Sequence, residues 1–96
     1  MTNDDITSLK VRVEGFVQGV GFRDFLVMSA QINKLDGWVR NGADGAVEAL
    51  VSGPTKAVEA FVAAATQGPR GARVTAVDLQ NCEPPTEKGF QRKATA

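Results

Sequence analysis

Histidine is absent from this sequence of 96 residues, and Cys82 is its only cysteine. These two residue types supply most protein ligands for zinc and other transition metals, and histidine is the usual base beside a nucleophilic serine or cysteine. Their scarcity removes most such metal sites and every histidine-dependent catalytic triad. A lone cysteine also cannot form a disulfide within the chain, so we expect Cys82 to be an inert thiol near the end of a strand.

The chain has no excess charge of either sign, because eleven basic side chains balance eleven acidic ones. Without a broad positive field, neither a nucleic acid nor an anionic membrane is an expected partner. Any bound anion must be held by a few neighbouring groups. No apolar run approaches the roughly 18 residues of a membrane span, and the N-terminus lacks the pattern of a signal peptide. These absences predict a soluble, cytoplasmic protein.

The length of 96 residues allows one hydrophobic core and is too short for two. Hydrophobic residues make up 43% of the chain and charged residues 23%, which is ordinary for a globular protein. We expect a single domain over residues 1–96, in which the polar residues 1–7 form a frayed terminus. The sequence shows no additional apolar stripe, so a monomer is expected.

The apolar residues recur with two different periods. Alternation over residues 9–14 predicts a strand, and three- and four-residue steps predict a helix over residues 22–33. Residues 36–53 contain two strands around a turn rich in asparagine, aspartate and glycine, which predicts a hairpin. A second helix is expected from Pro54, at a first-turn position, to the glycines that begin at Gly68.

A further strand follows, and its apolar positions shift phase by one residue between Val74 and Val77, which predicts a β-bulge. After Pro84 and Pro85, only the segment GFQRK, residues 89–93, is a candidate to rejoin the sheet, as a short or frayed strand. The order strand, helix, strand, strand, helix, strand predicts an α+β ferredoxin-like fold, a βαββαβ sandwich with two helices on one face of an antiparallel sheet.

The segment VEGFVQGVGFRDF, residues 13–25, connects the first strand to the first helix. Its loop contains Gly15, Gly19 and Gly21, so several backbone amides should be free in one concavity at a helix N-terminus, which is an anion-binding geometry. Arg23 falls in the first helical turn, where a cation is unfavourable beside the positive end of the helix dipole unless an anion accompanies it. An arginine fork can bind two oxygens of a phosphate or carboxylate.

The glycine spacing matches neither a dinucleotide-binding fingerprint nor a nucleotide P-loop, so a ligand smaller than a nucleotide is expected. A plain connection between strand and helix is the alternative interpretation of this loop. An RNA-binding sheet is a further alternative, but it needs aromatic residues with basic neighbours on the open face. None of the six aromatic residues falls in such a strand motif.

Two segments resemble the acylphosphatase family: GFVQGVGFR at residues 15–23 and GWVRNGADGAVE at residues 37–48. A helix containing Phe61 and a Gly-Pro pair at residues 68–69 follow in the order and spacing of that family, and the resemblance extends over residues 9–79. It implies the ferredoxin-like fold and the hydrolysis of small-molecule acyl phosphates to a carboxylate and inorganic phosphate, without a metal or cofactor.

The resemblance also implies roles for particular residues. Arg23 and Asn41 match the catalytic residues of the family: Arg23 would bind the phosphate, and Asn41 would hold the attacking water, whose proton passes to a phosphate oxygen. The substrate-binding loop would comprise Val17, Gln18, Gly19, Val20 and Gly21. Taken alone, Asn41 could be a turn former and Gln18 a solvated loop residue.

The chain departs from the family pattern at two places. Asn33 and Lys34 stand where the first helix usually ends with leucine and glycine, and Asn33 is expected to adopt the left-handed cap. Arg92 stands where an apolar residue is expected in the last strand. The rival function is a non-catalytic anion-binding or regulatory module of the same fold, as found within larger proteins such as hydrogenase-maturation carbamoyltransferases. We expect the enzyme, because the chain ends after one domain.

Overall fold

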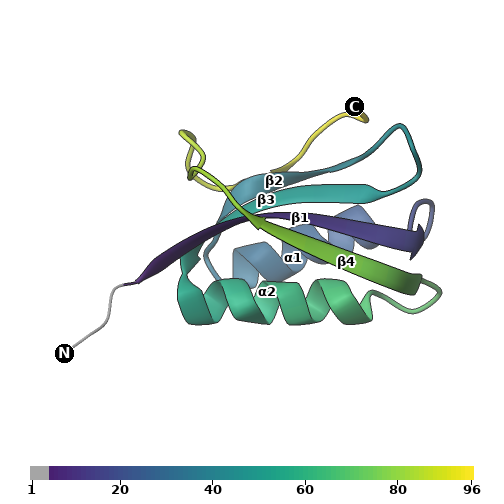
Figure 1. The fold of residues 1–96 in the computed structure, drawn as a ribbon, viewed down its shortest axis with the longest axis horizontal. Helices are drawn as coiled ribbons and strands as arrows, with labels where there is room; N and C mark the ends of the chain where they lie inside the picture. Colours follow the sequence, from purple (N-terminus) through teal and green to yellow (C-terminus); the bar gives the residue numbers. More distant parts are fainter. Residues whose placement is uncertain (1–4) are drawn as a thin grey trace.

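Strands and helices alternate along the chain in the order predicted from the periodicities, with one further strand at the C-terminus. The computed structural model describes residues 5–96, and Figure 1 shows two helices covering one face of a sheet. The elements are β1 (Ile6–Phe16), α1 (Phe22–Ile32), β2 (Asp36–Asn41), β3 (Val47–Pro54), α2 (Thr55–Gln67), β4 (Arg73–Asn81) and β5 (Phe90–Arg92).

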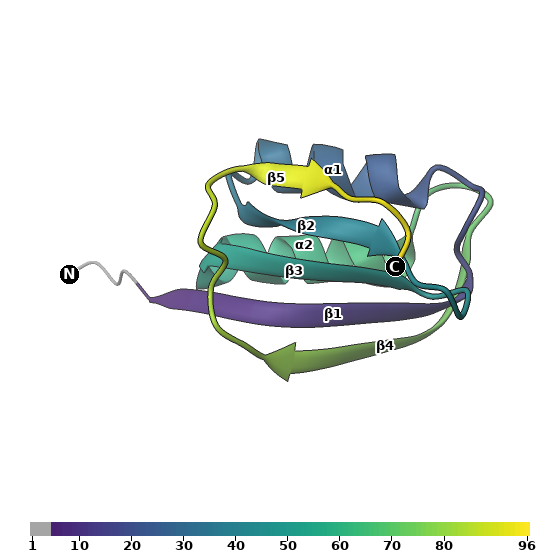
Figure 2. The same ribbon diagram turned by 90° about the horizontal axis from the view of Figure 1, so that it is seen from above.

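The sheet has the strand order β4-β1-β3-β2-β5, which is visible from above in Figure 2. The pairs β1–β3, β1–β4 and β2–β3 are antiparallel. The ferredoxin-like class is therefore confirmed, but the sheet is mixed, because β5 pairs in parallel with β2. This strand is the GFQRK segment, and it is short, as expected. Beyond β5, the C-terminal segment also contacts β2, because the amide of Ala96 donates to the carbonyl oxygen of Asn41 at 3.0 Å.

The first strand begins earlier than its alternation predicts. Ile6 and Thr7, expected in a frayed terminus, instead pair with Pro54 and Gly53 of β3. The hydroxyl groups of Thr7 and Thr55 are 2.7 Å apart, which also ties β1 to the start of α2. Residues 1–4, the rest of the predicted frayed terminus, lie outside the described residues.

The predicted bulge is present in β4. Glu14 pairs with Ala76, and the next residue, Gly15, pairs with Val74, so Thr75 is the extra residue. Gly15 has φ 128, and a Cβ atom there would collide with the carbonyl oxygen of Arg73. Only glycine combines that backbone conformation with so close an approach. The bulge therefore fixes where β1 bends into the glycine-rich loop.

The core lies between the sheet and the helices, because both helices bury their apolar stripe against the inward face of the strands. The largest fully buried side chains are Phe22, Phe61, Leu26, Val11, Val13, Val17, Val39, Val47, Val51 and Val58. Within residues 5–96, neither α1 nor α2 has the combination of length and apolar character needed to cross a bilayer.

The helix termini differ in detail from the sequence-based expectation. Helix α1 ends at Ile32, and Asn33 has φ −90, so the prediction of a left-handed Asn33 is wrong. The left-handed residue is the next one, Lys34, with φ 58, and its amide donates to the carbonyl oxygen of Gln31 at 3.1 Å. Pro54 precedes α2 as its N-cap, not as a first-turn residue.

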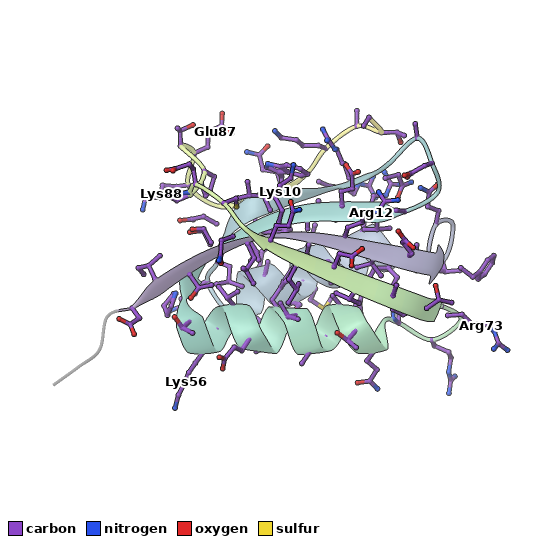
Figure 3. The ribbon with its side chains drawn as sticks, viewed as in Figure 1. Lys10, Arg12, Lys56, Arg73, Glu87 and Lys88 are labelled. Carbon is purple, nitrogen blue, oxygen red and sulfur yellow. The ribbon has the colours of Figure 1, made fainter. Side chains whose placement is uncertain are left out.

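The face of the sheet opposite the helices is polar and ion-paired. Figure 3 shows Lys10 and Arg12 projecting from this open face, whereas Lys56 points away from the sheet on α2. Trp38 also lies on this face, with the guanidinium carbon of Arg40 4.8 Å and Lys93 Nζ 5.2 Å from its ring centroid. The expectation that no aromatic residue with basic neighbours lies there is therefore wrong. A single tryptophan is nevertheless short of the two or three stacking residues of an RNA-binding sheet.

Cys82 immediately follows β4 and is half-buried. Burial raises the pKa of its thiol above the ordinary value, and Glu83 acts in the same direction, while Lys10 opposes both. Because the thiolate is the reactive form, the raised pKa favours low reactivity, and the inert thiol remains a prediction.

Alkylation of Cys82 should therefore be slow. At a pH near 9, we expect iodoacetamide to label the folded protein more slowly than it labels the urea-unfolded protein, because less thiolate is present in the folded state. Mass spectrometry of timed samples measures both rates. Labelling that is equally fast in the two states would contradict the raised pKa.

The bulge predicts unequal effects of two glycine substitutions. Gly71→Ala is the control, since Gly71 has φ 93 but open space around its Cβ position, and the backbone strain should cost about 1–2 kcal/mol of unfolding free energy. Gly15→Ala adds the collision with Arg73 and should cost roughly 1–3 kcal/mol more. Urea denaturation compares the two, and equal destabilisation would show that the close approach is absent.

Candidate functional site

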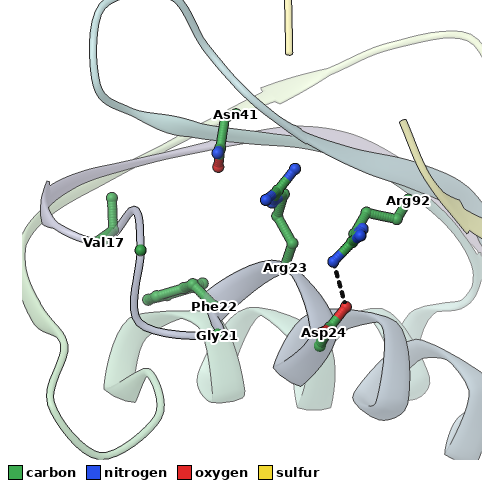
Figure 4. Close-up of a pocket in the computed structure, with 8 residues that line it drawn as sticks. Val17, Gly21, Phe22, Arg23, Asp24, Asn41 and Arg92 are labelled. Atoms are coloured by element: carbon green, nitrogen blue, oxygen red, sulfur yellow. Dashed lines mark hydrogen bonds and ion pairs between the residues drawn. The ribbon is translucent and has the colours of Figure 1, made fainter. Parts of the chain in front are cut away.

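A small pocket lies where the glycine-rich loop, the N-terminus of α1, the end of β2 and the end of β5 meet (Figure 4). Its volume is about 60 Å³, which suits an anion of a few heavy atoms. The lining residues are Val17, Gly19, Gly21, Phe22, Arg23, Asp24, Asn41 and Arg92.

The loop is shaped by two buried anchors and two left-handed glycines. Val17 and Phe22 are each 1% exposed and hold the loop against the core at both ends. Between them, Gly19 and Gly21 have φ 78 and φ 77, a conformation that glycine adopts without strain. Gly21 is the N-cap of α1 and makes no side-chain cap hydrogen bond, so no side chain of the cap competes for the amides of the first helical turn.

Arg23 brings a positive charge to these amides. Among residues 5–96, its side chain makes no hydrogen bond or ion pair. Figure 4 shows its guanidinium rising from α1 toward Asn41, with the loop on one side and Arg92 on the other. A half-buried arginine has five N–H donors to satisfy, and its position beside the positive end of the helix dipole is favourable only with an anion present. The pocket is thus suited to a small anion with several oxygen atoms.

Asn41 reaches the same space from the opposite wall. It is the last residue of β2 and pairs with Val47. Val39, two residues earlier, is completely buried on the inward face, and side chains two apart in a strand share a face. The amide of Asn41 therefore points toward the helix layer, and Figure 4 shows it facing Arg23 across the pocket. No side-chain hydrogen bond of Asn41 is made within the described part of the chain.

Gln18 connects the loop to the hairpin that follows Asn41. Its Nε2 donates to the carbonyl oxygens of Gly42 and Ala46, each at 2.9 Å. The amide of Gly42 also donates to Ala46 at 2.7 Å, which closes the turn. Gln18 therefore fixes the distance between the loop and the strand end on which Asn41 lies.

Arg12 supports the same hairpin from the open face of the sheet. Its Nη2 lies 2.6 Å from Asp44 Oδ2 at the turn, and its other nitrogens contact Glu14 and Glu48. The hydrogen bond from Arg12 lowers the pKa of Asp44 below its ordinary value. Glu14 and Glu48 both lie in this ion-paired network and away from the pocket, so they do not form a pair of carboxylates suited to acid and base catalysis.

The structure brings together five of the seven residues that the sequence indicated. Arg23, Asn41, Val17, Gly19 and Gly21 line one pocket. Gln18 and Val20 were expected in the binding loop but are not among the lining residues. Gln18 acts on the hairpin instead, and the side chain of Val20 packs against the core.

The sequence interpretation missed three lining residues, Phe22, Asp24 and Arg92. Arg92 Nη1 donates to Asp24 Oδ1 at 2.8 Å, so β5 and α1 are bridged at the edge of the pocket. A signal for Arg92 exists in the segment GFQRK: if Phe90 faces inward, Arg92 does too, and a charged inward residue is unusual in a strand.

Comparisons with known proteins agree with this geometry. The family model described as Acylphosphatase matches residues 9–92. An acylphosphatase of Acidiphilium cryptum is 51% identical over 83 residues, which are 86% of this chain and 91% of that protein.

Solved structures give the same result. The crystal structure of an acylphosphatase from Bacillus subtilis has a TM-score of 0.85 at 37% identity and covers 93% of this chain and 99% of that one. Full-length HypF, in its phosphate- and nucleotide-bound form, contains a similar region with a TM-score of 0.88 at 27% identity, which covers 98% of this chain but 13% of HypF. With its fold, its loop and its relatives in agreement, the chain belongs to the acylphosphatase family.

Proposed function

We propose that the chain hydrolyses the carboxyl–phosphate bond of acyl phosphates, with the phosphate held by the loop of residues 15–21 and Arg23, and the attacking water placed by Asn41. Hydrolysis of acyl phosphates follows from membership of the family. One observation carries the assignment of residues: a guanidinium without a partner among residues 5–96 faces the amide of Asn41 across a phosphate-sized pocket.

Phosphate binding relies on charge without a metal ion. Backbone amides of the loop and the first turn of α1 donate to the phosphate oxygens, and Arg23 supplies a full positive charge with two parallel donors. During phosphoryl transfer, charge is spread over the equatorial oxygens, so donors that are already in place lower the barrier. Arg23 has no ion pair with residues 5–96, so none of these residues has to release it before substrate binds.

The attacking water must be held in place, and another group must accept its proton. The side-chain oxygen of Asn41 can accept a hydrogen bond from water and direct its lone pair at phosphorus. A bond forms between the water oxygen and phosphorus, the bond from phosphorus to the acyl oxygen breaks, and the carboxylate leaves with its electron pair. The water proton passes to a phosphate oxygen, so neither a histidine nor another enzyme base is required.

The rival function, a non-catalytic anion-binding or regulatory module, would use the same pocket. The likeness to part of HypF is compatible with such a module. The relative from Acidiphilium cryptum, however, is itself named an acylphosphatase and is matched over 91% of its length, which favours the enzyme.

The biological setting is part of the same proposal. We propose one acylphosphatase-like domain that acts as a cytoplasmic monomer on small-molecule acyl phosphates, without a nucleic acid or membrane partner. The zero net charge and the lone cysteine support this setting. The ion-paired carboxylates and arginines of the open face support it as well.

Two substitutions separate the roles of the catalytic residues. With benzoyl phosphate and excess chelator, wild-type protein should release phosphate, and Arg23→Ala and Asn41→Ala should each lower kcat/KM roughly 100- to 1,000-fold. Arg23→Ala should also lose affinity for inorganic phosphate, whereas Asn41→Ala should retain it. Arg70→Ala, an exposed arginine outside the pocket, is the matched control and should behave as wild type.

Calorimetric phosphate binding and circular dichroism complete this test. Unchanged turnover in folded Asn41→Ala would remove Asn41 from the mechanism. Wild-type protein that binds phosphate but does not hydrolyse benzoyl phosphate would favour the regulatory module instead.

Substitution of Gln18 tests whether its hydrogen bonds hold Asn41 in position relative to the loop. Gln18→Leu keeps the approximate volume but removes both donated hydrogen bonds, and the carbonyl oxygens of Gly42 and Ala46 lose a partner. We expect kcat for benzoyl phosphate to fall about tenfold while KM changes little, because Asn41 moves relative to the loop. Gln31→Leu, at an exposed glutamine on α1, is the control. An unchanged kcat in Gln18→Leu would show that this link does not align the site.

A further inference from the structure

A second guanidinium lies on the wall of the same pocket. Arg92 ends β5, pairs with Val39 of β2, and lines the pocket together with Arg23 and Asn41. Phe90 is buried in the core, and residues two apart in a strand share one face. Arg92 therefore points toward the helix layer from a position at which an apolar side chain would ordinarily pack, and this charge needs an explanation.

The ion pair with Asp24 uses little of the hydrogen-bonding capacity of Arg92. Nη1 donates to Asp24 Oδ1 at 2.8 Å, which is the one side-chain hydrogen bond of Arg92 among residues 5–96. The other N–H groups of a guanidinium remain available. The side chains of Arg92 and Asp24 are 49% and 74% exposed, and an ion pair so exposed adds little stability.

Asp24 does not depend on Arg92 for its own stabilisation. It lies in the first turn of α1, where the helix dipole favours a carboxylate. Arg92 can therefore redirect its guanidinium to another anion at small cost, and Asp24 remains in a favourable place.

The acyl portion of a substrate must lie outside the phosphate site. The pocket has a volume of about 60 Å³, so a phosphate group bound there leaves little room for the acyl portion. In Figure 4 the glycine-rich loop lies on one side of Arg23 and Arg92 lies on the other. A phosphate bound by the loop and Arg23 leaves the wall beyond Arg23, which carries Arg92, as the charged surface next to the acyl portion.

We propose that Arg92 binds a carboxylate on the acyl portion of the substrate, so that the chain prefers acyl phosphates derived from dicarboxylic acids. The proposal rests on the proposed function, because it places the phosphate in the loop beside Arg23. A carboxylate presents two oxygens in the geometry that an arginine fork matches, which gives Arg92 a role that its exposed pair with Asp24 does not explain.

The test compares matched substrates. The pairs are 3- and 4-carboxybenzoyl phosphate and the corresponding carbamoylbenzoyl phosphates, which have the same shape without the charge. The rigid ring prevents the carboxylate from attacking its own anhydride. The measured quantity is the ratio of kcat/KM for carboxylate over amide within each variant, which cancels differences in the amount of folded protein.

Two variants distinguish recognition from a structural role. We expect a ratio of roughly three to ten for wild-type protein at low salt, falling as ionic strength rises. Arg92→Gln should bring the ratio to about one. Asp24→Asn breaks the same ion pair but keeps the guanidinium, so its ratio should equal or exceed that of wild type. Arg70→Gln, outside the pocket, is the control.

The outcomes separate this inference from the proposed function. Wild-type protein that hydrolyses none of the four compounds, and no benzoyl phosphate, contradicts the proposed function and the inference with it. Hydrolysis with a ratio of one in wild type overturns the inference alone. A ratio that is unchanged in Arg92→Gln, or that falls equally in Arg92→Gln and Asp24→Asn, shows that the pair is structural and also overturns it.

Discussion

The proposed active centre depends on one positive charge, that of Arg23, for which residues 5–96 supply no counter-ion. Arg23 lies at the N-terminus of a helix, where a cation is unfavourable, and no side chain of residues 5–96 compensates it. Three other arginines are paired with carboxylates: Arg12 and Arg40 on the open face, and Arg92 with Asp24. In the proposed function, an anionic substrate supplies the missing counter-charge, and binding and catalysis use the same guanidinium.

The rest of the structure holds the guanidinium of Arg23 in a fixed position relative to Asn41. The bulge at Gly15 sets where β1 ends, Val17 anchors the loop in the core, and Gln18 links the loop to the hairpin after β2. These contacts join three segments that are distant in sequence. In the proposed mechanism, hydrolysis of a reactive anhydride is mainly a matter of charge and placement, and these contacts provide the placement.

Local patterns predicted most of the fold, because the alternation of Leu9, Val11 and Val13 and the spacing of Phe22, Phe25 and Leu26 report burial directly. The position of Arg23 in the first helical turn indicated an anion-binding residue, whereas Asn41 and the catalytic roles came from the family resemblance. The structure gives the physical reason for their meeting. The inward direction of Arg92 is signalled by the segment GFQRK, but its position beside the pocket could not be predicted from local pattern, since it depends on the parallel pairing of β5 with β2. The left-handed residue after α1 was misplaced by one position, which periodicity does not resolve.

A crystal structure of the protein grown with inorganic phosphate tests the central claim most directly. The account predicts a phosphate ion bound by backbone amides of residues 15–21 and by two nitrogens of Arg23, with an ordered water between the ion and the side chain of Asn41. Phosphate absent from the loop at saturating concentration, or Arg23 turned to a carboxylate of the protein, would contradict it.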